Sequence, residues 1–300
     1  DDLIDFTPEL NAEARRVVSR YRLGPMFLPG TVSKVEGPLA ALTIGTTGGG
    51  TNWPGAGGDP DNHIVYAQAA NAGIAPIGLV EPPPGFSDIK YVAGTAGQPF
   101  VEREGPGFGS AADSPQRGGA VQRQAEAERA AAAGRGAQQA PPQGGGGGLT
   151  VQGLPLLKPP YGVLNAIDLD KGEIKWQVPH GDTPDAVRNS PALAGMNIPK
   201  TGQQGSVGLV VTKTLVVLGD PQVTPTPDHP RGAMLRAYDK QTGKEVGAVW
   251  MPAPQSGSPM TYKGPDGRQY FIVAISGGNY SGEYLAFALP PTEIRPTTQQ

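Results

Sequence analysis

The sequence predicts an all-β fold whose short strands are arranged as blades of a β-propeller. The first observation is strand patterning: residues 232–290 contain short apolar runs separated by turns rich in Gly, Pro and Asp. The second is an internal repeat, because the spacing Ala-x-Asp-x-x-x-Gly occurs at residues 166–172 and again at 237–243. A repeat of this kind indicates a propeller, in which each copy belongs to one four-stranded blade.

Trp176 extends the first copy of the repeat to the longer pattern Ala-x-Asp-x-x-x-Gly-x-x-x-Trp. This pattern resembles the tryptophan-docking motif of the quinoprotein alcohol and glucose dehydrogenases, which are eight-bladed propellers that carry pyrroloquinoline quinone (PQQ). The second copy departs from the motif, since Gly247 holds the docking position and Trp250 lies three residues later. The resemblance therefore implies docking at Trp176 and a different arrangement at Trp250.

The first 22 residues predict an extended segment followed by a helix. Thr7 can cap the helix with its hydroxyl, and Glu9 in the first turn complements the helix dipole. Apolar residues at helical spacing give the helix one apolar face: Leu10, Ala14, Val17, Val18 and Tyr21. We expect this helix to pack on the outside of a sheet domain. The segment also resembles a mid-chain part of glucose-dehydrogenase-like quinoproteins, which implies that further blades precede Asp1.

A glycine-rich corner at residues 48–55 precedes a predicted strand at 64–67. It is neither a dinucleotide fingerprint nor a P-loop, because no helix pattern and no Lys-Ser or Lys-Thr follows. From the residues alone it is a tight β corner. Its Gly-Gly-Thr-Asn-Trp sequence is similar to the quinoprotein corner that places an Asn amide against the quinone carbonyls. The resemblance implies that Asn52 and Trp53 line the cofactor site.

A second candidate cofactor contact follows the apolar run at residues 270–275, which predicts a strand. Gly278 and Asn279 end this strand, where similar quinoproteins bring backbone and a side chain toward the cofactor edge. The polar loop that begins at His180 also resembles a quinoprotein segment. Its clustered polar residues are interpreted as satisfying one another and the backbone, with no catalytic role: Asp182, Asp185, Arg188 and Asn189.

Residues 72–160 interrupt a blade, so the strands before Ala72 and after Tyr161 are predicted to pair. Residues 105–148 are rich in Ala, Gly and Gln and lack the apolar surface needed to offset chain entropy. We expect this part to be poorly ordered and dispensable for folding. In order, the chain divides into a helix and the first half of a blade (1–71), the insertion (72–160), the remaining blades (161–290) and a C-terminal tail (291–300).

The number of blades is too small to close a ring. Residues 209–219 predict two strands around residues 212–214, and residues 256–290 predict about three strands of a last blade. With the repeat, this gives about three blades. The fold class is therefore a partial propeller, and the resemblance implies that it is the C-terminal part of an eight-bladed one.

Composition excludes several classes of function. The net charge of −3 gives no basic surface for nucleic acid or an acidic membrane, and the absence of cysteine excludes disulfides and thiolate chemistry. The three histidines lack metal-ligand spacing, and no Gly-x-Ser-x-Gly motif is present: His63, His180 and His229. No apolar run is long enough to span a bilayer. No metal ligand is assigned.

The resemblance implies a periplasmic oxidoreductase that oxidises an alcohol or an aldose such as glucose by hydride transfer to PQQ, with calcium as a second cofactor. Its electron acceptor would be a quinone or a cytochrome c. The family motifs for the catalytic Asp and the calcium ligands are not in this sequence. No catalytic residue is therefore assigned, and the chain alone is expected to be inactive without N-terminal blades of the same protein. The alternative is a non-enzymatic propeller scaffold that binds other proteins. A glycosidase or lyase propeller has no supporting motif.

Overall fold

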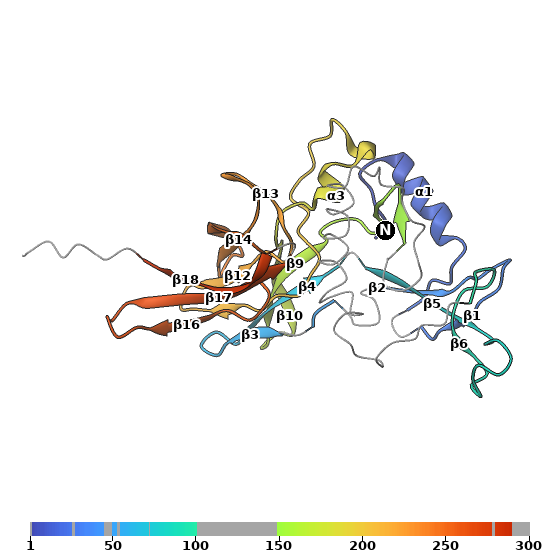
Figure 1. The fold of residues 1–300 in the computed structure, drawn as a ribbon, viewed down its shortest axis with the longest axis horizontal. Helices are drawn as coiled ribbons and strands as arrows, with labels where there is room; N and C mark the ends of the chain where they lie inside the picture. The colour runs from blue at the N-terminus through green and yellow to red at the C-terminus, as the bar shows by residue number, and fades with distance from the viewer. Residues whose placement is uncertain are drawn as a thin grey trace, which may run out of the picture.

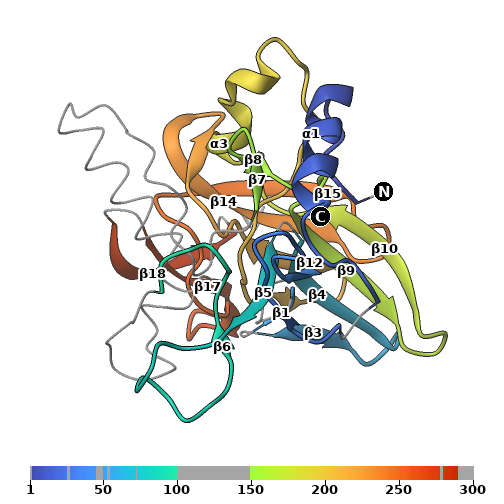
Figure 2. The same cartoon turned by 90° about the vertical axis from the view of Figure 1, so that its right-hand side faces the viewer.

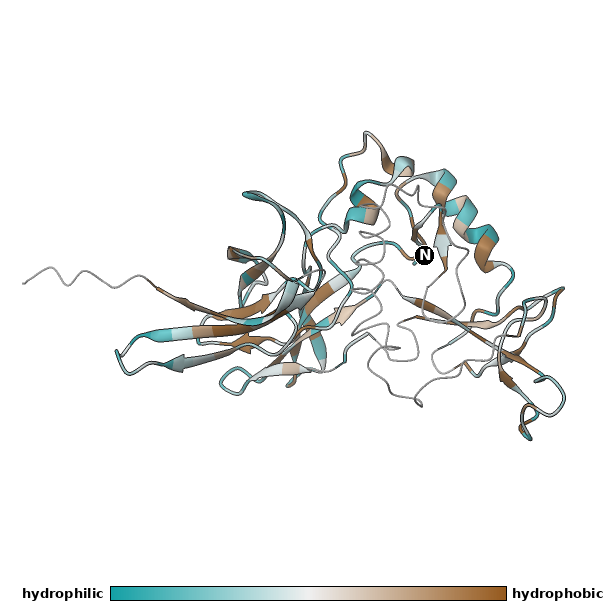
Figure 3. Cartoon of the chain, viewed as in Figure 1, coloured by the Kyte–Doolittle hydropathy of each residue, from teal (hydrophilic) through white to brown (hydrophobic). Residues whose placement is uncertain are grey.

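The computed structural model describes residues 2–25, 28–44, 50–52, 55–71, 73–100, 149–277 and 280–289. Strands dominate the described residues, as predicted, and three antiparallel sheets form successive blades (Figures 1 and 2). Apolar residues concentrate in these strands, while the turns between them are largely hydrophilic (Figure 3). None of the described helices is long and apolar enough to cross a membrane.

Blade 1 contains four strands in the order β10-β9-β4-β3: β3 (Ala56–Asp59), β4 (Ile64–Ala70), β9 (Gly162–Asp168) and β10 (Glu173–Pro179). β4 and β9 pair along their whole length, from Ile64 opposite Asp168 to Ala70 opposite Gly162. The prediction that the strands on either side of the insertion belong to one blade is confirmed.

Blade 2 follows with the order β11-β12-β14-β15: β11 (Val210–Val211), β12 (Leu215–Gly219), β14 (His229–Asp239) and β15 (Glu245–Met251). A short strand, β13 (Thr224–Thr226), also pairs with the start of β14. Blade 3 has three strands: β16 (Met260–Lys263), β17 (Gln269–Gly277) and β18 (Tyr280–Ala288). The sheets do not close a ring among the described residues, so the predicted partial propeller is confirmed.

Blade 2 packs against a neighbouring blade on each of its two faces, and an apolar cluster fills each contact. Tyr66 and Leu164 of blade 1 pack against Leu218 and Tyr238 of blade 2. The opposite face of blade 2 packs on blade 3 through residues that include Leu235. Burial of these side chains stabilises the contact between blades, since each contributes roughly 1.5–3 kcal/mol when fully removed from water.

Trp176 of blade 1 docks on blade 2, as the family resemblance of the repeat implied. Its indole Nε1 donates a hydrogen bond to the carbonyl oxygen of Lys240 at 3.2 Å. A Cβ atom added to Gly243 would lie 2.7 Å from the Trp176 ring, so the glycine allows this close approach. Trp250 differs, because its ring stacks on His229 within its own blade at a centroid distance of 4.0 Å.

The N-terminal part forms a separate layer around the helix α1 (Pro8–Val18). The Thr7 hydroxyl accepts a hydrogen bond from the backbone N–H of Leu10 at 3.2 Å, so the predicted cap is confirmed. The buried face of the helix includes Leu10, Ala14 and Val18. It packs beside a small hairpin of β7 (Thr150–Val151) and β8 (Leu154–Pro155).

A further sheet combines β1 (Thr31–Val32), β2 (Ala41–Ile44), β5 (Ile74–Val80) and β6 (Val92–Ala93). β2 pairs with β5, so only β3 and β4 of residues 1–71 enter a blade. The segment predicted to be poorly ordered, residues 105–148, lies outside the described residues, and that expectation stays a prediction.

Candidate functional site

The connections between strands differ at the two ends of the blades. At one end they are short turns, such as residues 169–172 between β9 and β10. At the other end they are long, such as residues 180–209 between β10 and β11. The same ends of adjacent blades lie together, because the Gln255 side-chain oxygen accepts a hydrogen bond from the Gly219 N–H at 2.6 Å. We call the end with long connections the loop end.

Asn52 lies at the loop end, on the corner that leads into the innermost strand β3, and it is exposed. The corner is held against β4, because the Ala70 N–H donates to the Gly50 carbonyl oxygen at 2.7 Å. A Cβ atom on Gly50 would lie 2.8 Å from the Ala70 oxygen, so a side chain there would push the corner away. The glycine-rich sequence thus presents Asn52 at this end.

The other three predicted cofactor residues lie outside the described residues: Trp53, Gly278 and Asn279. The strands that flank the last two are described. β17 ends at Gly277 and β18 begins at Tyr280, and these residues pair with each other. Because β17 runs toward the loop end, Gly277 and Tyr280 lie at the same end of the blades as Asn52.

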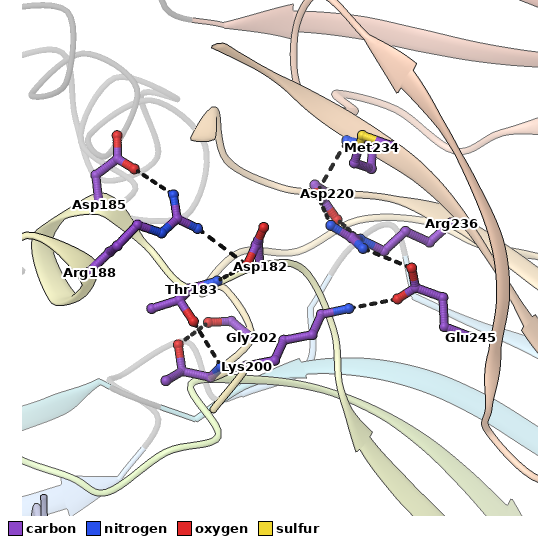
Figure 4. Close-up of polar contacts among 11 residues, drawn as sticks. Asp182, Thr183, Asp185, Arg188, Lys200, Gly202, Asp220, Met234, Arg236 and Glu245 are labelled. Carbon is purple, nitrogen blue, oxygen red and sulfur yellow. Dashed lines mark hydrogen bonds and ion pairs between the residues drawn. The ribbon is translucent and has the colours of Figure 1, made fainter. Parts of the chain in front are cut away.

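The loop end also contains a cavity of about 340 Å³. It lies between the β10–β11 connection and β14 (Figure 4). Seven residues line it: Asp182, Thr183, Arg188, Met196, Ile198, Lys200 and Arg236. Sequence analysis singled out Asp182 and Arg188 without assigning them a site, and it missed Lys200 and Arg236. Arg236 comes from a distant strand, and no local pattern links it to the loop.

Arg236 forms the rigid side of the cavity. Its Nε and Nη2 atoms contact the two carboxylate oxygens of Asp220 at 2.6 and 2.9 Å, and both side chains are almost fully buried. Burial alone would lower the pKa of Arg236, but hydrogen bonds and charge attraction from Asp220 outweigh it and raise the pKa. A bidentate pair of this geometry fixes both groups in place.

Glu245 in β15 joins this pair to the loop. Its carboxylate accepts from Arg236 Nη1 at 2.9 Å and from Lys200 Nζ at 2.6 Å. Burial alone would raise the pKa of Glu245, but Lys200 and Arg236 together lower it, so the carboxylate is charged at neutral pH. The result is a row of alternating charges that ties the β10–β11 connection to blade 2.

The remaining charges at the cavity are paired more loosely. Arg188 lies 3.3 Å from an oxygen of Asp182 and 3.4 Å from an oxygen of Asp185, and its side chain is 33% exposed. Charge-assisted hydrogen bonds usually span 2.7–2.9 Å. Arg188 therefore holds its partners weakly in comparison with Arg236.

His180 lies fully buried at the start of the β10–β11 connection. Its Nε2 contacts the Gly219 carbonyl oxygen at 3.1 Å, and its Nδ1 contacts the Tyr238 hydroxyl at 3.0 Å. A carbonyl can only accept, so Nε2 carries the hydrogen and the tyrosine donates to Nδ1. Burial lowers the pKa of His180 to about 4, which leaves it neutral at pH 7. Within the described residues, no group of three or more His, Cys, Asp or Glu side chains is placed to hold a metal.

Comparison with known proteins gives consistent matches. A probable quinate dehydrogenase (quinone) from Xanthomonas campestris is 34% identical over 148 residues, or 47% of this chain. The quinate/shikimate dehydrogenase (quinone) of Acinetobacter baylyi is 31% identical over 155 residues, also 47% of this chain. Quinoprotein glucose dehydrogenase A of Acinetobacter calcoaceticus is 30% identical over 147 residues, again 47% of this chain. The matched part spans 17% of the length of each relative.

A solved structure of a europium-containing methanol dehydrogenase covers 77% of this chain and 25% of its own, at 17% identity and a TM-score of 0.34. The family assignment rests on sequence. Residues 107–271, more than half of the chain, match the family model described as the β-propeller domain of PQQ-dependent glucose, ethanol and alcohol dehydrogenases. The chain therefore belongs to this family of quinoprotein dehydrogenases.

Proposed function

We propose that this chain is part of a dehydrogenase that oxidises the hydroxyl group of an alcohol or a sugar with PQQ. The observation that carries the proposal is the family membership of the chain together with the exposed Asn52 at the loop end. The relatives named above act on quinate, shikimate or glucose, and a further relative from Gluconobacter oxydans is a glycerol dehydrogenase. All of these substrates carry hydroxyl groups.

Bound PQQ would supply the acceptor for the hydride. The described residues fit such a group at one point, because Asn52 is exposed on a glycine-rich corner at the loop end. We propose that the Asn52 N–H donates to a quinone oxygen, where negative charge grows as the quinone is reduced. Trp53, Gly278 and Asn279 would complete the contact at the same end.

The proposal assigns the general-base Asp and the calcium ligands to residues outside this chain, in further blades of the same protein. This view is supported by the coverage of the relatives, because the part matched by this chain is 17% of the length of each. Residues 1–300 alone would then be inactive. A periplasmic location and a quinone or cytochrome c as electron acceptor complete the proposal, and both rest on the family resemblance.

The test is Asn52→Ala in the full-length protein supplied with PQQ and calcium. We expect turnover to fall on the order of 10²-fold, because removing one donor to a developing oxyanion typically has this effect. PQQ affinity should change much less, since the hydrogen bond is stronger in the transition state than in the ground state. Gln241→Ala, which removes an exposed amide from the short turn between β14 and β15, is the matched control and should leave turnover unchanged. Equal turnover in both variants would remove Asn52 from the site.

A further inference from the structure

We infer that the cavity beside Lys200 binds a small carboxylate that carries hydroxyl groups, at a position separate from the cofactor. The inference does not depend on the proposed function, because it concerns binding by the described residues alone. The cavity volume of about 340 Å³ lies within the usual range of small-molecule sites, roughly 300–1,000 Å³.

The cavity lies on the outer half of blade 2. Arg236 belongs to β14 and its partner Glu245 to β15, the two outer strands, whereas Asn52 precedes the inner strand β3 of blade 1. The opposite wall packs on the cluster around α1 through Val187 and Ile198. The cavity therefore lies where the N-terminal layer meets the blades, and ligand sites often lie between such parts.

The charges of the lining favour an anion. Three cations and one carboxylate line the cavity, and two of the cations retain capacity for a ligand. Lys200 has three N–H donors, of which one contacts Glu245 among the described residues. Arg188 is exposed by about a third, and its long contacts can be exchanged for shorter ones to a ligand carboxylate. Arg236, whose bonds to Asp220 are short and buried, serves as a fixed wall.

The rest of the lining suits a hydroxylated carbon skeleton. The Asp182 carboxylate is 38% exposed and can accept hydrogen bonds from ligand hydroxyls. Met196 and Ile198 provide an apolar surface for carbon atoms. Three carboxylates beside the cations compete with the ligand for them: Asp185, Asp220 and Glu245. We therefore expect an affinity in about the millimolar range.

The experiment is calorimetric titration of the 300-residue chain, without PQQ, with quinate as the probe. Quinate should bind and should be released by added salt, because salt screens exposed charges. Glucose and glycerol, which are neutral, should not bind, and acetate, which has no hydroxyl, should bind at least about tenfold more weakly. Binding of glucose as strong as that of quinate would overturn the inference.

Three variants locate the site. Arg188→Gln and Lys200→Gln should each raise the dissociation constant for quinate about tenfold, since each loses a charged hydrogen bond. Lys263→Gln, on the exposed strand β16, is the matched control and should bind as the parent does.

Met196→Trp separates loss of binding from loss of folding. It fills the cavity and leaves every ion pair in place, so it should abolish quinate binding while the thermal unfolding curve stays unchanged. Absence of quinate binding to the parent chain, or equal binding by the parent and Met196→Trp, would refute the site. Competition between PQQ and quinate would refute its separation from the cofactor.

Discussion

Lys240 of blade 2 places its Nζ atom 2.7 Å from the Asp59 carboxylate of blade 1, and both side chains are more than nine-tenths buried. The Lys240 carbonyl oxygen also accepts hydrogen bonds from the Tyr66 hydroxyl and from the Trp176 indole. The hydrogen bond from Lys240 lowers the pKa of Asp59 despite burial, so the Asp59 carboxylate is charged at neutral pH. One residue of a surface turn therefore joins two blades through its side chain and its backbone.

Asp59→Ala should be strongly destabilising. The change leaves the Lys240 ammonium buried without its carboxylate, and breaking a buried ion pair in this way costs about 3–5 kcal/mol. The free energy of unfolding from urea denaturation measures the effect. Asp170→Ala is the control, because Asp170 pairs with His63 at the surface and should cost less than about 1 kcal/mol. Similar losses of stability in the two variants would show that the buried Asp59–Lys240 pair stabilises the fold no more than a surface pair does.

The two tryptophans of the repeat should respond differently to the loss of the indole N–H. Trp176→Phe removes a hydrogen bond to Lys240, which should cost about 1 kcal/mol. Trp250→Phe removes no such hydrogen bond, because the Trp250 Nε1 has no hydrogen-bond partner among the described residues. Loss of this N–H should therefore leave the free energy of unfolding nearly unchanged. Chemical denaturation of both variants tests the difference. A larger loss for Trp250→Phe would contradict the docking arrangement.

Gly243→Ala and Gly172→Ala form a matched pair of substitutions. Both glycines have positive φ, +72° and +70°, so both changes carry the cost of a left-handed alanine, about 1–2 kcal/mol. Only Gly243 has a ring against it, whereas a Cβ atom on Gly172 would meet no described atom within 4 Å. We expect Gly243→Ala to be the more destabilising in thermal unfolding, and equal losses would mean that the Trp176 ring moves aside freely.

Stability should fall in mild acid because of His180. The folded pKa of about 4 lies below the unfolded value near 6.5. Below pH 6.5 the unfolded chain therefore binds a proton that the folded chain excludes. The free energy of unfolding should decrease by up to about 1.4 kcal/mol per pH unit between pH 6.5 and 4. Urea denaturation at pH 7 and pH 5 measures this slope.

The matched variants are His180→Gln and His63→Gln. The first should flatten the slope between pH 7 and pH 5, although its stability at pH 7 will be lower. The second changes an exposed histidine and serves as the control for the substitution itself. An unchanged slope in His180→Gln would assign the acid sensitivity to other groups.

Short sequence motifs predicted those features that are determined by residues close together in the chain. The Thr7 cap follows from a short pattern, and the docking of Trp176 follows from the resemblance that its pattern carries; both are confirmed. The pairing of β2 with β5 did not follow, because a four-residue apolar run does not identify its partner. The sequence did not predict the cavity, because a charged residue such as Arg236 within an apolar strand is expected to face solvent. Its burial depends on Asp220, which the fold and not the sequence brings close.

The contact between Trp176 and Lys240 also bears on how fast the blades can assemble. The two residues are 64 positions apart in the chain. The entropy of closing a loop of this length is lost before the contact stabilises the fold, and contacts of large sequence separation slow folding for this reason. The docking of blade 1 on blade 2 is therefore expected to be among the slower steps of folding, whereas each hairpin within a blade closes over a few residues.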